Sequence, residues 1–171
     1  MAISSANVKL TTCLFFESEA EEAAKFYVSI FPNSSVETTS HFLDEGKEHH
    51  RQSPGSVMIL AFNLNGHSFT ALNSKPADIK FNESISFQVI CDTQEEIDYY
   101  WDKLSEGGDE TKQICGWTRD KYGVSWQVVP KIIPEIMNSG DKTKQARVTL
   151  AFMKMKKIII KDILDAVEQK D

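Results

Sequence analysis

The sequence is poor in cysteine and has no long apolar run. Its three cysteines are an odd number without a C-x-x-C spacing, so we expect reduced thiols in a cytoplasmic protein rather than disulfides. The longest unbroken apolar run, Val57 to Phe62, is far below the ~20 residues that a membrane-spanning helix needs. Residues 1–9 show no basic segment followed by an apolar one, so we expect no signal peptide.

The chain also lacks a surplus of basic residues. It has 19 Lys and Arg against 25 Asp and Glu, for a net charge of −6 at pH 7. Nucleic-acid-binding domains usually carry a basic patch or stripe, so this balance argues against a nucleic-acid partner. The short basic run Lys154, Lys156 and Lys157 is followed by acidic residues and predicts a solvated face or a subunit contact. The other fractions, 41% hydrophobic and 26% charged, are those of an ordinary globular protein.

The first half of the chain predicts one strand, one helix and three further strands. Residues 8–16 are β-rich, and Ser18 with Glu21 predicts a capping box that opens a helix. Strands are expected at 36–42, 56–64 and 67–73, with a polar loop at 43–55. Asn65-Gly66 predicts the tight turn of a hairpin, because both residues tolerate positive φ.

The same order is expected again after a connector at 74–82. A strand at 84–91 has Ile85, Phe87 and Val89 on one face, and Thr93 with Glu96 predicts a second capping box. Strands are then expected at 110–115, 117–121 and 124–129. The two predicted N-caps, Ser18 and Thr93, are 75 residues apart, which indicates an internal repeat. Two halves of this kind can bury sheet faces together and leave a concave surface between them.

The tail is less regular. Residues 138–145 are polar and we expect them to be mobile, whereas 148–155 and 158–167 are amphipathic. A helix is expected at 160–167.

Several motifs carry a resemblance to a known family. They are Ala-Lys-Phe-Tyr-Val-Ser-Ile-Phe-Pro at 24–32, Phe-Thr-Ala-Leu-Asn at 69–73, Asn-Glu-Ser-Ile-Ser-Phe-Gln-Val at 82–89, Cys-Gly-Trp at 115–117 and Asp-Lys-Tyr-Gly-Val-Ser-Trp-Gln-Val-Val-Pro at 120–130. Together they resemble the vicinal oxygen chelate superfamily of glyoxalase I, extradiol dioxygenases and bleomycin-resistance proteins. The similarity is greatest to the subgroup labelled 3-demethylubiquinone-9 3-methyltransferase domain or phosphonate-operon-like protein.

The resemblance implies an α+β fold in a single domain, residues 1–171. Two βαβββ modules, 8–75 and 82–130, would form a pair of glyoxalase-like half-barrels with eight strands around a pocket, followed by a C-terminal helical tail at 131–171. The resemblance also implies a homodimer.

The superfamily's metalloenzymes take their ligands from the first and last strands of each module. Matched by motif, these positions are Thr11, Ala71, Ser84 and Gln127. Only Gln127 is a plausible ligand, and one neutral amide does not hold a catalytic metal ion. We therefore expect no metal and no other cofactor.

The favoured hypothesis is a metal-free protein that binds a small hydrophobic or aromatic molecule. The predicted binding residues are Thr11, Cys13, Asn73, Ser84, Ser86, Trp117 and Gln127. Their neutral polar groups can orient a ligand but include no strong base.

Three alternatives stay open. The first is a metal-dependent lyase, isomerase or dioxygenase, which needs ligands that the motif positions lack. The second is the methyltransferase of the family label, although none of the eight glycines forms the G-x-G of a common cofactor turn. The third is a protein-interaction module.

Other titratable residues are expected to be structural or solvated. Glu83 and Asp120 are candidate acids or bases, but carboxylates at strand ends are usually solvated. The loop histidines His41, His49 and His50 are expected in solvent, and Cys91 is expected to be buried.

Overall fold

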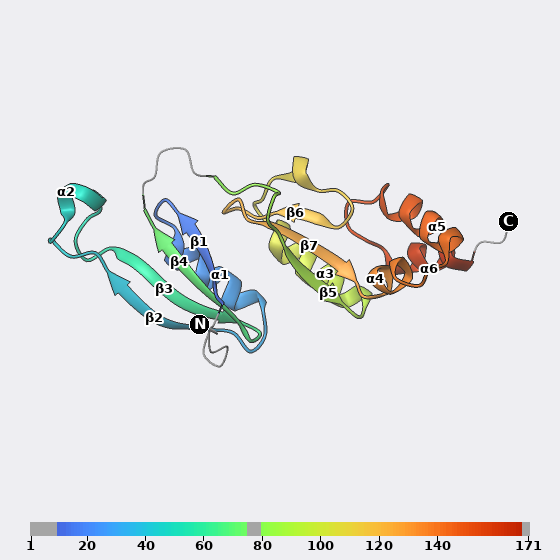
Figure 1. Ribbon diagram of the computed structural model, residues 1–171, viewed down its shortest axis with the longest axis horizontal. Helices are drawn as coiled ribbons and strands as arrows, with labels where there is room; N and C mark the ends of the chain where they lie inside the picture. Colours follow the sequence, from blue (N-terminus) through green and yellow to red (C-terminus); the bar gives the residue numbers. More distant parts are fainter. Residues whose placement is uncertain (1–9, 75–79, 169–171) are drawn as a thin grey trace, which may run out of the picture. The chain divides into compact units, whose positions relative to one another are not determined.

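The structure is a computed structural model that describes residues 10–74 and 80–168. The chain divides into two compact units, 1–79 and 80–171, which are described here separately (Figure 1). Within the described residues, no helix is long and apolar enough to cross a membrane.

The first unit contains a four-stranded sheet. Its strands are β1 (Thr12–Phe16), β2 (Ser35–His41), β3 (Val57–Leu64) and β4 (His67–Asn73), in the order β1-β4-β3-β2. β1 is parallel to β4 and the other neighbours are antiparallel. The predicted order of elements is confirmed, including the turn at Asn65-Gly66, where φ is 47° and 89°. The expected polar loop also contains a short helix, α2 (Lys47–His50).

Helix α1 (Ala20–Ile30) covers one face of this sheet. Alternate strand residues such as Leu60, Phe62 and Phe69 are buried on that side, as the two-residue period of a strand requires. The helix contributes small residues and one large one: Ala20, Ala23, Ala24 and Tyr27 are completely buried. The Tyr27 ring stacks on Phe62 with ring centroids 6.4 Å apart. These residues form the buried face of the helix.

The predicted capping box at Ser18 is wrong. The helix begins at Ala20, two residues later, and its N-cap Glu19 makes no side-chain capping bond. Instead, the Ala20 N–H donates to Oδ1 of Asn73 at 2.9 Å. An acceptor from a distant strand has taken the place of the local cap, which no local pattern could reveal.

The second unit contains a three-stranded sheet and one covering helix. The strands β5 (Phe87–Cys91), β6 (Trp117–Arg119) and β7 (Ser125–Pro130) are arranged in the order β5-β7-β6, with β5 parallel to β7. Helix α3 (Gln94–Ser105) packs on this sheet through Ile97, Trp101 and Leu104. Its predicted capping box is confirmed, because Thr93 and Glu96 each bond the other's backbone N–H.

Of the strands predicted for this unit, the one at 110–115 is absent from the described residues and the one at 84–91 is shorter. Residues Glu110–Lys112 form a 3-10 turn, η2, and Ile114 makes only an isolated bridge to Trp117, so the described part of the sheet has three strands rather than four. The strand predicted at 84–91 begins at Phe87, and Ile85 is 74% exposed. The side chain of Asn82 accepts the Ser84 N–H at 2.9 Å and so favours a turn over a strand. The pairing of the two sheets as half-barrels stays a prediction.

The C-terminal segment forms three helices, α4 (Ile132–Met137), α5 (Lys142–Phe152) and α6 (Ile160–Glu168). The helix expected at 160–167 is confirmed. The segment expected to be mobile at 138–145 is partly helical, since Asp141 caps α5 by accepting the Lys144 N–H at 3.1 Å. A core cluster holds the segment together: Ile133, Ile136, Val148, Ile158 and Ile163.

The two predicted N-caps, Ser18 and Thr93, give a matched test of local and distant capping. Thr93→Ala is expected to lower the free energy of unfolding by about 1 kcal/mol, because it removes a side-chain cap. Ser18→Ala is expected to change it by less than about 0.5 kcal/mol, because the Ser18 hydroxyl caps nothing. Urea denaturation of both variants checks this, and equal losses would contradict the structure.

Candidate functional site

The face of the second sheet that α3 leaves uncovered gathers several of the predicted binding residues. In β7, Trp126 and Val128 are buried on the α3 side, and Gln127 between them lies on the opposite side. Gln127 pairs with Gln88 of β5 on one flank and with Trp117 of β6 on the other. Because registered residues of neighbouring strands share a face, Gln88, Trp117 and Gln127 lie together. We call this side of the sheet the open face.

Hydrogen bonds fix the amides of the open face. Nε2 of Gln127 donates to the Ser86 hydroxyl at 2.7 Å, and Oε1 of Gln127 accepts from Nε2 of Gln88 at 3.2 Å. Both ends of the Gln127 amide are therefore engaged by neutral groups. Gln88 is exposed, whereas Ser86, Trp117 and Gln127 are half-buried. The arrangement offers neutral donors and acceptors beside an indole.

The charges nearest to the open face form ion pairs with one another. Glu83 forms ion pairs with Lys112 at 2.8 Å and with Arg119 of β6 at 2.6 Å. The hydrogen bond from Lys112, with the nearby Arg119 charge, lowers the pKa of the Glu83 carboxyl below its ordinary value. Glu83 thus stays ionised at neutral pH, which makes it a poor general acid and a weak base.

Asp120, the other candidate acid or base, is buried and serves the β6–β7 turn. Its Oδ1 accepts the N–H groups of Tyr122 at 2.8 Å and Val124 at 3.0 Å. Its Oδ2 accepts the indole N–H of Trp126 at 2.8 Å. The expectation of a solvated carboxylate is wrong here, because three donors hold Asp120 inside the fold. This explains the Asp-Lys-Tyr-Gly-Val-Ser-Trp motif as a structural turn.

The structure brings three of the predicted residues together: Ser86, Trp117 and Gln127. Ser84 is exposed in the turn that precedes β5. Thr11 and Cys13 belong to the first unit, where both are exposed and the Thr11 hydroxyl donates to the Ser68 carbonyl at 2.9 Å. Gln88 was not among the predicted binding residues, although its alternation with Ser84 and Ser86 placed it on the same side of the expected strand.

Asn73 is a structural residue rather than an accessible binding residue. It is 6% exposed, its Oδ1 caps α1, and its Nδ2 donates to the Val57 carbonyl at 3.0 Å. One side chain thereby joins the end of β4, the start of β3 and the start of α1. A polar residue at the end of a strand looks the same in the sequence whether it serves a ligand or the fold.

The four positions that match metal ligands do not fit a metal ion. Ala71 is fully buried and has no donor atom, and the Gln127 amide is hydrogen-bonded at both ends. Across residues 10–74 and 80–168, no group of three or more His, Cys, Asp or Glu side chains could hold a metal ion. We therefore derive no chemical step through a metal.

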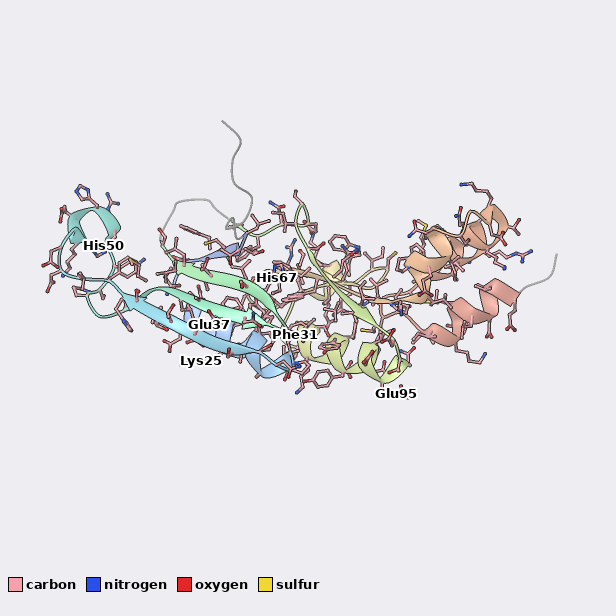
Figure 2. The ribbon with its side chains drawn as sticks, turned by 60° about the horizontal axis from the view of Figure 1, so that its bottom comes forward. Lys25, Phe31, Glu37, His50, His67 and Glu95 are labelled. Atoms are coloured by element: carbon pink, nitrogen blue, oxygen red, sulfur yellow. The ribbon has the colours of Figure 1, made fainter. Side chains whose placement is uncertain are left out.

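The histidines do not converge on one point. His50 is half-buried, its ring lies 4.6 Å from that of Phe42 between centroids, and its Nδ1 accepts the Gln52 N–H at 3.0 Å. It is therefore less solvated than expected, whereas His41 and His49 are exposed. His67 lies at the other end of the sheet, at the start of β4 (Figure 2).

Comparison with known proteins gives one family match and several similar structures. Residues 8–129 match the family model described as 3-demethylubiquinone-9 3-methyltransferase. A PhnB protein of Bacillus cereus, described under the same methyltransferase name, is 35% identical, with a TM-score of 0.63 over 72% of this chain and 99% of that chain. Protein PA1353 of Pseudomonas aeruginosa is 19% identical, with a TM-score of 0.53 over 72% and 98%.

The fosfomycin resistance protein FosX of Listeria monocytogenes is 16% identical, with a TM-score of 0.48 over 77% of this chain and 96% of that chain. No curated protein matches the chain. The family match ends at residue 129, so the helices α4, α5 and α6 lie beyond it.

The cysteines are expected to differ in reactivity. Burial, reinforced by the charges of Glu96 and Asp92, raises the pKa of the Cys91 thiol to about 12, so little thiolate is present at pH 8. Cys13 is exposed. With Ellman's reagent we expect Cys13 to react first and Cys91 only after unfolding. In Cys13→Ser the fast phase should vanish; a fast phase that remains would show that another thiol carries it.

Asn73→Ala tests the structural assignment of that residue. The substitution leaves the Ala20 N–H without its buried acceptor, so the free energy of unfolding is expected to fall by about 1–3 kcal/mol. Ser84→Ala is the control, because Ser84 is exposed and its backbone N–H, not its hydroxyl, makes the bond in the turn. Denaturant titration measures both, and an unchanged stability of Asn73→Ala would contradict the assignment.

Proposed function

Because the chain belongs to the 3-demethylubiquinone-9 3-methyltransferase family, and because its second sheet presents an indole beside linked neutral amides, we propose that it binds a small, uncharged aromatic or hydrophobic molecule on the open face. The binding needs no metal ion. The observation that carries the proposal is the hydrogen-bonded series Ser86–Gln127–Gln88 next to Trp117.

The chemistry of the open face favours an uncharged ligand. A ring can pack on the Trp117 indole, and such aromatic pairs contribute about 0.5–1.5 kcal/mol beyond the area they bury. The Gln88 amide and the Ser86 hydroxyl can donate to or accept from a carbonyl or hydroxyl of the ligand, and the Gln127 amide has a second N–H besides the one bound to Ser86. The charged neighbours Glu83, Lys112 and Arg119 already form ion pairs with one another.

The titratable groups favour binding over turnover. Glu83 is held ionised by two cations, and Asp120 is engaged by three donors. The pKa of Cys91, raised to about 12, makes that thiol a poor nucleophile at neutral pH. These groups therefore give no support to acid–base or covalent catalysis at the open face.

The methyltransferase in the family's description receives little support from the loops of this chain. Methyltransferase cofactors are commonly bound at a Gly-rich turn between a strand and a helix. Here β1 is followed by Glu17, Ser18 and Glu19, and β5 is followed by Asp92 and Thr93. Neither turn contains glycine. Saturable binding of S-adenosylmethionine in calorimetry would favour the methyltransferase instead.

Ligand binding can be tested with prodan, a neutral aromatic ketone whose fluorescence rises in apolar sites. We expect saturable binding to the full chain and a Kd about tenfold weaker for Trp117→Leu, since a tenfold change corresponds to about 1.4 kcal/mol. Tyr99→Leu is the matched control: Tyr99 is an exposed aromatic residue of α3, on the other side of the sheet, and its loss should leave the Kd unchanged.

The proposal is wrong if prodan binds equally well to wild type and Trp117→Leu. It is also wrong if neither prodan nor any member of a library of neutral aromatic compounds binds saturably. The homodimer that the family resemblance implies stays a prediction, and sedimentation analysis addresses it separately.

A further inference from the structure

The C-terminal segment is hydrogen-bonded to the turn that precedes Trp117. The Cys115 N–H donates to the Met155 carbonyl at 2.7 Å, and the Gly116 N–H donates to the Lys156 carbonyl at 2.8 Å. Both bonds join backbone groups of consecutive residues. The turn and residues 155–156 are therefore joined through their backbones.

This turn has little freedom to move on its own. Cys115 and Gly116 both have positive φ, 54° and 81°, and the flanking Ile114 and Trp117 exchange both backbone hydrogen bonds, as in a two-residue hairpin. A Cβ atom on Gly116 would lie 2.8 Å from the Val128 carbonyl oxygen and 3.2 Å from the Ile158 side chain. The turn is thus wedged between β7 and the C-terminal segment, one residue before the indole of the open face.

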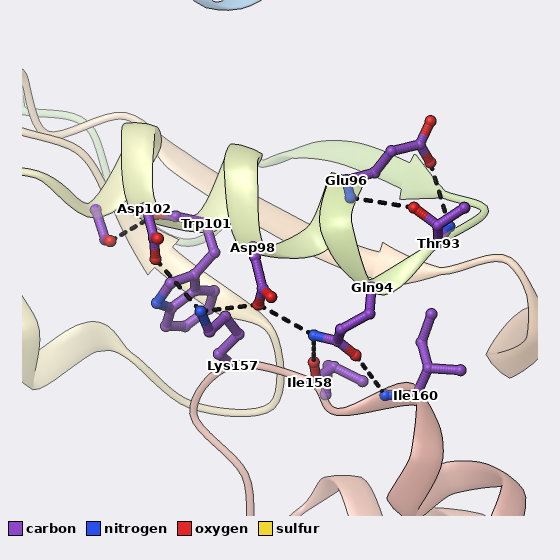
Figure 3. A network of polar contacts seen from close by, with 10 residues as sticks. Thr93, Gln94, Glu96, Asp98, Trp101, Asp102, Lys157, Ile158 and Ile160 are labelled. Atoms are coloured by element: carbon purple, nitrogen blue, oxygen red, sulfur yellow. Dashed lines mark hydrogen bonds and ion pairs between the residues drawn. The ribbon is translucent and has the colours of Figure 1, made fainter.

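The same segment is anchored to α3 by polar contacts (Figure 3). Nζ of Lys157 lies 2.9 Å from Asp98 and 3.3 Å from Asp102. The Gln94 side chain binds both sides of Ile158: it donates to the Ile158 carbonyl at 3.2 Å and accepts the Ile160 N–H at 2.8 Å. Gln94, Asp98 and Asp102 are spaced four residues apart and therefore lie on one face of α3.

The anchor also has an apolar part. Ile158 is 1% exposed and belongs to the core cluster of α4, α5 and α6. Residues 155–160 therefore link three structures: the turn before Trp117, the outer side of α3 and the C-terminal helices.

We propose that residues 155–160 position the indole of Trp117 for ligand binding, with Lys157 as the positioning residue. The expected effect on ligand affinity rests on the proposed function, whereas the expected effect on the orientation of Trp117 does not. It places a determinant of affinity outside residues 8–129, the part of the chain that matches the family. When Lys157 loses its hold on α3, the backbone pairing at Cys115 and Gly116 loosens, and the Trp117 indole takes up more than one orientation.

The test uses the full chain labelled with 5-fluorotryptophan, whose three tryptophans give three ¹⁹F NMR resonances. Lys157→Met is expected to shift or broaden the Trp117 resonance and to weaken the Kd for prodan about two- to tenfold. Lys157→Arg, which retains the charge, should restore both. Lys154→Met is the matched control: Lys154 is an exposed lysine three residues away and should change neither.

The Trp126 resonance serves as an internal reference, because this buried indole is held by Asp120. If the Trp117 resonance and the Kd of Lys157→Met match those of wild type, the inference is overturned. If Lys157→Met fails to fold, Asp98→Asn replaces it and should shift the Trp117 resonance in the same direction; no shift there overturns the inference. If wild type does not bind prodan but the Trp117 resonance still depends on Lys157, the positioning role stands and the proposed function fails.

Discussion

A β-sheet has two faces, and in each unit of this chain one helix, α1 or α3, covers one of them. The covered faces are made of alternating large apolar residues. Helix α1 packs on its sheet with a face that is rich in alanine, and α3 packs on its sheet with the apolar residues Ile97, Trp101 and Leu104. The opposite faces cannot be built in the same way without exposing apolar area to water. In the second sheet that face carries the Gln88 and Gln127 amides and the Trp117 indole, and the pair Ile90 and Val129 lies two residues further along it.

The sequence was most informative where a signal is local. The Thr93–Glu96 box and the Asn65-Gly66 turn are complete within a few residues, and both are present as expected. Of the predicted binding residues, Ser86 and Gln127 are hydrogen-bonded to each other, whereas Gln88 beside them was not predicted. Where partners are distant, the same reasoning failed. Ser18 has every feature of an N-cap, but Asn73 supplies the acceptor from 53 residues away. The strand predicted at 110–115 is also missing, because Asp109 draws the start of this segment into a turn by accepting the Thr111 N–H.

Polar residues of this chain divide between those that serve the fold and those that remain available. Asn73 and Asp120 are both buried, and their polar atoms already form hydrogen bonds with several backbone groups of the fold. Gln88 and Gln127 bind mainly each other and Ser86, so part of their capacity faces outward. The family name alone does not make this distinction, because an activity belongs to the groups that can reach a reacting molecule and not to the scaffold.

The C-terminal segment lies beyond the family match, yet it is bonded to the part of the chain that matches. Likeness ends at residue 129, within β7. A protein shortened to that point would lose the carbonyl acceptors for two consecutive N–H groups and the only lysine that Asp98 and Asp102 share within the described residues. It would also lose Ile158, whose side chain borders Gly116. Trimming for expression or crystallisation at the limit of the family match would therefore remove contacts of the turn before Trp117, and the chain should be kept through α6.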